Sequence, residues 1–286
     1  MLYFVSMFSR RLFLLKLLFL LTACKTAEKP KLGKLNLGVV SYGEGDRSIQ
    51  QYSVLTDYLA TELKTLVELE PAFNEVKALE QIKRKIWSVV FAPPGLAAIA
   101  ISEEQYLPLF PLEGLENARS VIVVRQESPI QKLTDLEGKA IALGQVGSAT
   151  GYYLPLYNLY GLTLAEVRFA PTPKTVLQWI DQKEVAAGAL SLAELERYRV
   201  DFGKAGFRIL YTDSVPTGSI LVGPSVERIQ QEQIRKVLGS ASPKITAAAG
   251  FLPNAKVPDY KPLIEKVARV RPIAEQIKKK PAALFK

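Results

Sequence analysis

The sequence predicts an α/β protein of two lobes, each a mixed sheet flanked by helices. From about residue 35 onward, apolar and β-branched segments alternate with segments whose apolar residues recur at helical spacing. The predicted strands contain few polar residues, which is typical of a parallel or mixed sheet covered on both faces. The alternation begins again after a polar connection at 128–139, so the chain has two similar halves rather than a series of short repeats.

The first half is predicted to hold four strands and three helices. Tyr52, Leu55 and Leu59 would share one face of the first helix, and Asn74 is a suitable N-cap for the second. The double proline 93–94 must end the third strand, because proline has no backbone N–H to donate a hydrogen bond to a neighbouring strand. In chain order, the strands are expected at 35–42, 67–73, 87–94 and 106–112, and the helices at 48–66, 74–85 and 95–104.

The second half repeats this order and then returns to the first. The strands are expected at 118–125, 141–144, 167–170, 185–190, 207–212 and 219–224, and the helices at 151–160, 173–183, 191–199, 225–238 and 262–280. Lobe 1 is therefore predicted to comprise 35–124 and 218–286, and lobe 2 to comprise 125–217. Two extended crossings between such lobes form a cleft, and ligands of α/β sheets bind beyond the carboxyl ends of the strands.

The N-terminal 23 residues have the features of a secretory signal. Arg10 and Arg11 precede an apolar run at 12–23, which is interrupted only by Lys16 and is short for a membrane span. The run ends at Cys24, the only cysteine, and Leu-Thr-Ala-Cys resembles the lipobox of bacterial lipoproteins. We therefore expect a signal peptide at 1–23, lipidation of Cys24 and a polar tether at 24–34 that holds the folded part at the extracytoplasmic face of a membrane. The alternative is a secreted protein, or an uncleaved anchor, in which Cys24 is an incidental small residue.

The net charge of +9 does not point to nucleic acid, because the basic excess lies at the two ends of the chain. Residues 1–34 contain seven Lys or Arg and one Glu, and residues 256–286 contain nine basic and three acidic residues. The middle of the chain is left with a net charge of −3. It shows no basic stripe with interleaved aromatic residues, so nucleic-acid binding is not expected.

The stretch LGQVGSATGYYLP, residues 143–155, places small and hydroxyl residues between a predicted strand and a predicted helix. Ser148, Ala149 and Thr150 would lie where the first backbone amides of a helix are unpaired, and Gly151 would let the backbone approach a ligand closely. A helix N-terminus with two hydroxyls can hold an anion without a lysine or arginine. The alternative is that Ser148 or Thr150 only caps the helix.

Two motifs in this region resemble those of the phosphonate, phosphate and phosphite-binding proteins of bacterial ABC importers. Asp135-Leu136-Glu137-Gly138-Lys139 matches the turn before the second lobe, and Ser148-Ala149-Thr150-Gly151-Tyr152, with Pro155, matches the stretch that opens it. The similarity extends in order and spacing from about Leu35 to about Gly223. The resemblance implies a type II periplasmic-binding-protein fold, a small anionic ligand and an ABC permease as partner.

By position, the resemblance assigns ligand contacts to several residues. Ser148 and Thr150 would donate hydroxyls to the anion, and Ala149 would offer only its backbone N–H. Tyr42 is the candidate donor from the first lobe, with an aromatic lid over the core edge as its alternative role. Ala92, after Phe91, would line the cleft.

The sequence departs from the family where aminophosphonate binders carry carboxylates for an ammonium group. The corresponding segments read VAAGALS and VPTGS and contain no acid, and the chain contains no histidine. We therefore expect phosphate, phosphite or a simple alkylphosphonate rather than an aminophosphonate.

An enzyme on the same fold is a second hypothesis for the function. Catalysis usually needs a titratable acid or base near the substrate, and Glu44 and Asp46, after the first predicted strand, are the best acid candidates. Their alternative role is that of solvated loop residues. No cluster has metal-ligand spacing, and neither a metal nor another cofactor is expected. A third hypothesis is a lipoprotein that senses a ligand for a membrane kinase, and a fourth is a binding protein that has lost its ligand. We expect a monomer.

Overall fold

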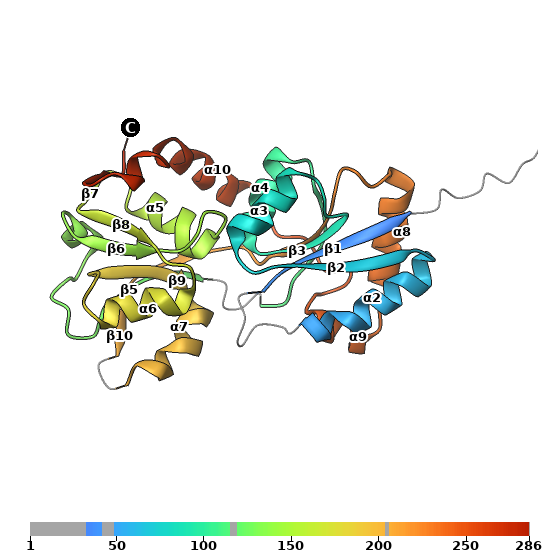
Figure 1. The fold of residues 1–286 in the computed structure, drawn as a ribbon, viewed down its shortest axis with the longest axis horizontal. Helices are drawn as coiled ribbons and strands as arrows, with labels where there is room; N and C mark the ends of the chain where they lie inside the picture. Colours follow the sequence, from blue (N-terminus) through green and yellow to red (C-terminus); the bar gives the residue numbers. More distant parts are fainter. Residues whose placement is uncertain (1–32, 42–48, 115–118, 204–205, 286) are drawn as a thin grey trace, which may run out of the picture.

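Two five-stranded sheets with helices on their faces form the two lobes of the molecule (Figure 1). The computed structural model describes residues 33–41, 49–114, 119–203 and 206–285. The architecture confirms the predicted α/β class with two lobes, each a mixed sheet flanked by helices.

The first sheet has its helices on both faces. Its strands are, in spatial order, β2 (Leu66–Ala72), β1 (Lys34–Val40), β3 (Val89–Ala92), β11 (Ser219–Val222) and β4 (Leu107–Pro111). Its helices are α2 (Ile49–Leu63), α3 (Glu75–Lys83), α4 (Pro94–Glu103), α8 (Arg228–Gly239) and α9 (Pro243–Ala249). β1 runs parallel to β2 and β3, and β11 lies antiparallel between β3 and β4. Because side chains alternate along a strand, Val89 and Phe91 belong to the core with α2, α8 and α9, whereas Val90 belongs to the core with α3 and α4.

The second sheet mixes parallel and antiparallel pairs. Its strands are, in spatial order, β10 (Phe207–Ser214), β5 (Arg119–Arg125), β9 (Ala187–Ser191), β6 (Ala140–Leu143) and β8 (Glu166–Phe169). β6 runs parallel to β8 and β9, and β5 is antiparallel to β9 and β10. One core contains α6 (Pro173–Asp181) and α7 (Leu192–Tyr198), and the other contains the helical turn η3 (Ala149–Tyr153), α5 (Leu154–Asn158) and α10 (Lys261–Val270). Short 3-10 turns are η2 (Leu133–Leu136), η4 (Arg199–Phe202), η5 (Arg271–Ile273) and η6 (Gln276–Lys278).

The division between the lobes differs from the expected one at two places. Strand β5 pairs with β9 and β10, so residues 119–124 belong to the second sheet and not to lobe 1. The C-terminal segment also returns to the second lobe, where β12 (Ala282–Ala283) pairs with β7 (Thr163–Leu164). The sequence of an apolar strand does not show which sheet the strand joins, because this depends on the distant strands to which it is hydrogen-bonded.

The C-terminal segment connects the two lobes. The helix expected at 262–280 ends at Val270, because Pro272 lacks an N–H and cannot continue an α-helix. Residues of α10 share one buried cluster with α4 of the first lobe and α5 of the second. Arg271 forms an ion pair with Glu103 at the end of α4.

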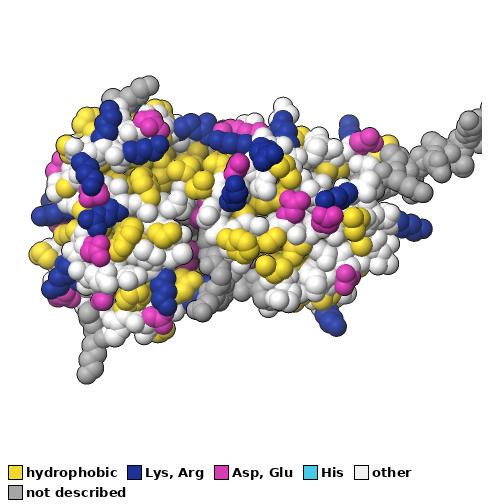
Figure 2. All heavy atoms as spheres, in the orientation of Figure 1, with side chains coloured by type: hydrophobic (Ala, Val, Ile, Leu, Met, Phe, Trp, Pro, Cys, Tyr) yellow, Lys and Arg dark blue, Asp and Glu magenta, His cyan; other side chains and the backbone are white. Residues whose placement is uncertain are grey.

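Several expectations lie outside the described residues. These are the signal peptide at 1–23, the lipidated Cys24, the tether at 24–34 as far as residue 32, and the candidate residues Tyr42, Glu44 and Asp46. Within the described part of the chain, no helix is both long and apolar enough to cross a bilayer. On the face shown in Figure 2, basic and acidic side chains are interspersed over both lobes.

Candidate functional site

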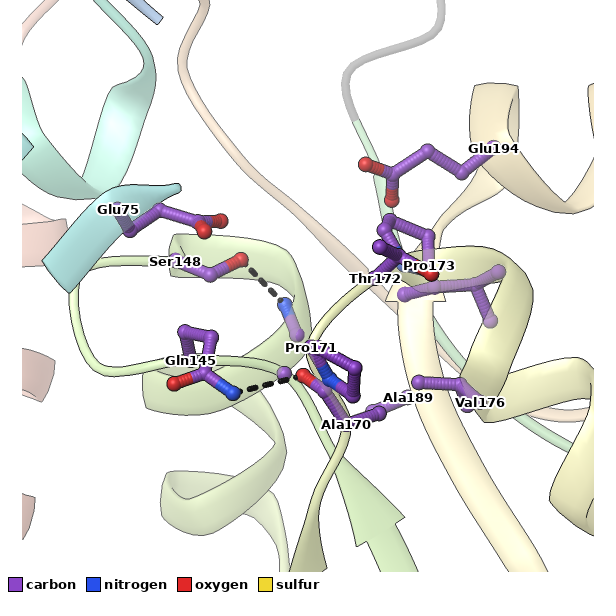
Figure 3. A pocket seen from close by; sticks show the side chains of 13 residues that line it. Glu75, Gln145, Ser148, Ala170, Pro171, Thr172, Pro173, Val176, Ala189 and Glu194 are labelled. Carbon is purple, nitrogen blue, oxygen red and sulfur yellow. Dashed lines mark hydrogen bonds between the residues drawn. The ribbon is translucent and has the colours of Figure 1, made fainter. Parts of the chain in front are cut away.

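A small pocket lies at the carboxyl ends of three parallel strands, between the two lobes (Figure 3). Gly144 and Gln145 follow β6, Ala170 and Pro171 follow β8, and Leu190 belongs to β9. The volume of the pocket is about 20 Å³, which is room for about one water molecule. The pocket therefore lies at the edge where ligands of α/β sheets bind, and Glu75 of the first lobe also lines it.

Three helical segments of the second lobe begin around this pocket. Ser148 precedes η3, Thr172 precedes α6, and Ser191 precedes α7. The cap hydroxyl of Ser148 accepts a hydrogen bond from the Gly151 amide at 3.0 Å, and that of Thr172 accepts from the Thr175 amide at 3.2 Å. The N-terminal amides and the positive ends of the helix dipoles favour a negative charge at this place.

The Ser148 side chain is a helix cap that also lines the pocket. Its Oγ is the N-cap acceptor for Gly151, as the capping alternative requires. A hydroxyl that accepts a hydrogen bond still has its own proton to donate, and the Ser148 side chain lines the pocket. Gly151 also lines the pocket, and its carbonyl accepts from the Gly144 amide at 2.8 Å, which fixes the loop between β6 and η3.

The helix after Ser148 begins with a π turn, two residues earlier than the sequence predicts. The Tyr153 amide donates to the Ser148 carbonyl at 3.1 Å, and the Leu154 amide donates to the Ala149 carbonyl. Each bond spans five residues, whereas an α-helical bond spans four. Single π turns of this kind occur frequently at functional sites.

Ala149 and Thr150 do not line the pocket. Ala149 is buried where the loop meets the first lobe: a Cβ built on Gly95 would lie 2.5 Å from its amide nitrogen. The Thr150 carbonyl accepts a hydrogen bond from the Ser120 hydroxyl at 2.7 Å, which ties the loop to β5. Their assignment as ligand contacts remains a prediction.

The candidates from the first lobe lie in different places. Ala92 is fully buried at the end of β3, pairs with Ser219 and does not line the pocket. Phe91 is a core residue, in an edge-to-face contact with Tyr52 at 5.3 Å between ring centroids. Tyr42 lies outside the described residues.

Two carboxylates that the sequence analysis did not consider line the pocket. Glu75, in the first turn of α3, is only 8% exposed, and Glu194 lies in the first turn of α7. Figure 3 shows both carboxylates directed toward the space between the lobes. The preference against an aminophosphonate was based on the segments VAAGALS and VPTGS, which contain no acid. The acids come from two helix starts and not from the segments VAAGALS and VPTGS.

A local signal for each glutamate is present in the sequence. Glu75 follows the N-cap Asn74 directly after β2, at the carboxyl end of a strand. Glu194 is the acidic member of a capping box with Ser191, and its Oε2 accepts from the Ser191 amide at 2.7 Å. Among the described residues that line the pocket, these two glutamates carry the only charges.

Two buried tyrosines, Tyr152 and Tyr153, belong to η3. Burial raises the pKa of Tyr152 to about 12. Burial also raises the pKa of Tyr153, partly offset by a backbone hydrogen bond from Gly147. Both rings therefore stay neutral at physiological pH and act as packing and hydrogen-bonding groups. Within the described ranges, no cluster of three or more His, Cys, Asp or Glu side chains could hold a metal ion.

The chain is similar to known proteins in sequence and in fold. The sequence model of one family, described as the phosphonate periplasmic substrate-binding protein of an ABC transporter, matches residues 37–266. No protein with a curated description matches the chain in sequence.

Similar solved structures share the fold. XAC2383 from Xanthomonas citri, described as bound to ATP, is 22% identical, with a TM-score of 0.69 over 84% of this chain and 98% of that one. A binding protein component of an ABC phosphonate transporter from Pseudomonas aeruginosa is 11% identical, with a TM-score of 0.65 over 86% and 89% of the two chains. PhnD1 from Prochlorococcus marinus, in complex with methylphosphonate, is 15% identical, with a TM-score of 0.64 over 82% and 96%.

Proposed function

Because this chain belongs to the family of periplasmic phosphonate-binding proteins of ABC transporters, we propose that it captures a small phosphorus oxyanion in the pocket between its lobes. One observation carries the proposal: η3, α6 and α7 all begin around a single pocket at the carboxyl ends of parallel strands. Three helix N-termini that converge on one point favour an anion there, without a basic side chain.

The Ser148 hydroxyl is the main side-chain donor in this account. It lines the pocket, and its own proton is available while its oxygen caps the helix. Thr172 lines the pocket as well, and its hydroxyl is close to that of Thr175, at 2.9 Å between the oxygens. Ala149 and Thr150 contribute through the loop that they form, and Tyr42 remains the proposed donor from the first lobe.

Capture proceeds by closure of the two lobes. The anion binds first to the second lobe, which supplies all the described pocket residues except Glu75. The first lobe then closes over the ligand, and the closed form docks on the membrane permease, which is the partner of this family. We propose phosphate, phosphite or an alkylphosphonate such as the methylphosphonate named for PhnD1 as the ligand. The pocket has room for about one water molecule in this structure, so the lobes must move apart to admit any of them.

The protein acts as a monomeric binding protein and not as an enzyme in this proposal. Lipidation at Cys24 would hold it at the extracytoplasmic face of the membrane through the tether. Mass spectrometry of the mature N-terminus tests the anchor: a lipid-modified Cys24 supports it, and an unmodified N-terminus elsewhere contradicts it. A sensor role with a membrane kinase remains the alternative. Ligand uptake measured in cells with and without the partner permease distinguishes the two roles.

Calorimetry on the purified protein tests the ligand class. The panel contains phosphate, phosphite, methylphosphonate, sulfate and a neutral solute of similar size. Tight binding of one phosphorus oxyanion supports the proposal. Binding of the neutral solute alone, with no anion bound, contradicts it.

A further inference from the structure

We infer that Gln145 is a positioning residue of the anion site, because its side chain joins the loop that carries Ser148 to the connection that leads into α6. The inference rests on the proposed function, since it concerns how the second lobe keeps that same site in shape. Gln145 acts through the position of Ser148 and not through a contact of its own with the anion. The second lobe therefore holds its hydroxyl and its helix starts in a fixed arrangement even without a ligand.

The side-chain amide of Gln145 reaches from one strand end to the next. Its Nε2 donates a hydrogen bond to the Ala170 carbonyl at 2.8 Å, and Figure 3 shows this bond beside the pocket that both residues line. Gln145 is the second residue after β6, and Ala170 directly follows β8. The Ala170 amide donates to the Leu143 carbonyl, also at 2.8 Å. Both backbone groups of Ala170 are therefore bonded to the end of β6 or to the loop after it.

The connection from β8 to α6 has few donors of its own. Its residues 170–173 read Ala-Pro-Thr-Pro, and neither Pro171 nor Pro173 has a backbone N–H. Ala170 is buried, so its carbonyl is shielded from water, and the Gln145 amide donates to it. A buried carbonyl without a donor is unfavourable. The bond therefore holds this connection, and with it the Thr172 cap of α6, against the loop between β6 and η3.

The backbone of Gln145 fixes Ser148 directly. The Ser148 amide donates to the Gln145 carbonyl at 3.1 Å, which closes a turn over residues 145–148. Gly147, within this turn, has a φ of 111°, in the region that favours glycine. The Ser148 hydroxyl in turn accepts from the Gly151 amide at 3.0 Å. A shift of Gln145 would therefore move Ser148 as well.

A double-mutant cycle separates positioning from direct contact. The variants are Gln145→Met, Ser148→Ala and the double variant, and calorimetry measures their affinities for methylphosphonate and phosphate. Methionine has nearly the length of glutamine but no N–H to donate. Gln145→Met should weaken binding by about threefold to tenfold, the effect of one neutral hydrogen bond. In the Ser148→Ala background it should change the affinity by less than about twofold, because the hydroxyl through which it acts is absent.

Gln231→Met is the matched control. Gln231 lies in α8 of the first lobe, away from the anion pocket, and its Nε2 also donates to a backbone carbonyl at 2.8 Å, that of Val226. The control loses the same kind of hydrogen bond, so it should lower stability in the same way as Gln145→Met. Both affinities should stay unchanged, which excludes a general effect of lost stability on binding.

Hydrogen exchange without a ligand gives a second readout. In the wild type the Ser148 amide should already be protected from exchange, because the turn is formed before an anion binds. In Gln145→Met the amides of residues 144–151 should exchange faster, since the loop loses its bond to Ala170. In Gln231→Met their exchange should match that of the wild type.

Three results would overturn the inference alone. An equal loss of affinity from Gln145→Met with and without the Ser148 hydroxyl would mean that Gln145 contacts the anion itself. Unchanged exchange of residues 144–151 in Gln145→Met would mean that its side chain does not hold the loop. An unprotected Ser148 amide in the ligand-free wild type would also contradict it, and this result does not depend on how a variant folds. If the wild type binds neither anion, the proposed function fails as well.

Discussion

Gly95 and Gly147 meet backbone to backbone across the two lobes. A Cβ built on Gly95 would lie 2.1 Å from the Gly147 carbonyl oxygen, so any larger residue would push the lobes apart. Gly95 lies in the first turn of α4, which follows the end of β3 at Ala92, and Gly147 belongs to the loop before η3. The two lobes therefore contact each other closely beside the anion site, at this pair of glycines.

Replacement of Gly95 tests this contact. Gly95→Ala should favour the open arrangement of the lobes and weaken anion binding, because the new methyl group collides with backbone that cannot move aside. The radius of gyration from small-angle X-ray scattering should increase relative to the wild type. Gly33→Ala is the control, since a methyl group there meets nothing within 4 Å. An unchanged radius and unchanged affinity in Gly95→Ala would contradict the closure mechanism.

Removal of the Ser148 hydroxyl should affect both stability and binding. Ser148→Ala loses the helix cap, which costs about 1 kcal/mol, and it loses a donor to the anion, which costs about 1.5–3 kcal/mol of binding free energy. Thermal unfolding and calorimetry measure the two effects separately. Asp135→Ala removes a side chain that accepts hydrogen bonds from the Gln131 and Lys132 amides, at 2.9 and 3.1 Å, away from the pocket, so it should lower stability with little change in affinity. Equal affinities of Ser148→Ala and wild type would show that Ser148 is a cap only.

The C-terminal segment should be essential to the second lobe. Leu284 is fully buried, and its backbone exchanges hydrogen bonds with Gly161 and Leu162. Leu284→Ala should lower the free energy of unfolding by about 2–5 kcal/mol through the cavity that it leaves. Phe285→Ala, at the next and exposed position, should change it by less than about 0.5 kcal/mol. Denaturant unfolding compares the two, and a similar effect of both would mean that the tail does not pack as described.

Buried tyrosines predict a loss of stability at high pH. Burial raises the pKa of Tyr106 to about 12 and that of Tyr152 to about 12, from a usual value of 10.0. Above pH 10 the unfolded chain loses these protons before the folded one does, so the contribution of the two tyrosines to stability is constant below that pH and falls as pH rises toward 12. Each group contributes up to about 1.4 kcal/mol per pH unit.

Denaturant unfolding at pH 9 and pH 11 measures this loss. Tyr106→Phe should reduce the difference between the two pH values. Tyr211→Phe, at an exposed position, should leave it unchanged. An equal difference in wild type and Tyr106→Phe would contradict the assignment.

Local features of the sequence were sufficient to predict much of the first lobe. The Asn74 side chain accepts a hydrogen bond from the Lys77 amide at 2.8 Å, which confirms it as the N-cap of α3. The double proline ends β3 at Ala92, and α4 begins at Pro94. The predicted face of α2 is also confirmed, because its buried residues are Tyr52, Leu55 and Leu59.

The features that could not be predicted all depend on contacts between distant segments. The sequence shows that β5 is a strand, but only its pairing with β9 and β10 places it in the second lobe. Glu75 has the sequence context of an ordinary first-turn acid of α3, and only closure of the lobes brings it to a pocket of the other lobe. A two-residue strand such as β12 has no periodicity, so its pairing with β7 could not be predicted from the sequence.

The central claim is that the pocket beside Ser148 binds a phosphorus oxyanion, and a crystal structure of the protein grown with methylphosphonate tests it most directly. The account predicts phosphorus density among the starts of η3, α6 and α7, with an oxygen within hydrogen-bond distance of the Ser148 hydroxyl. Phosphorus density elsewhere would contradict it. One such place is the groove lined by Lys256 and by Thr217, which lies in the connection between β10 and β11.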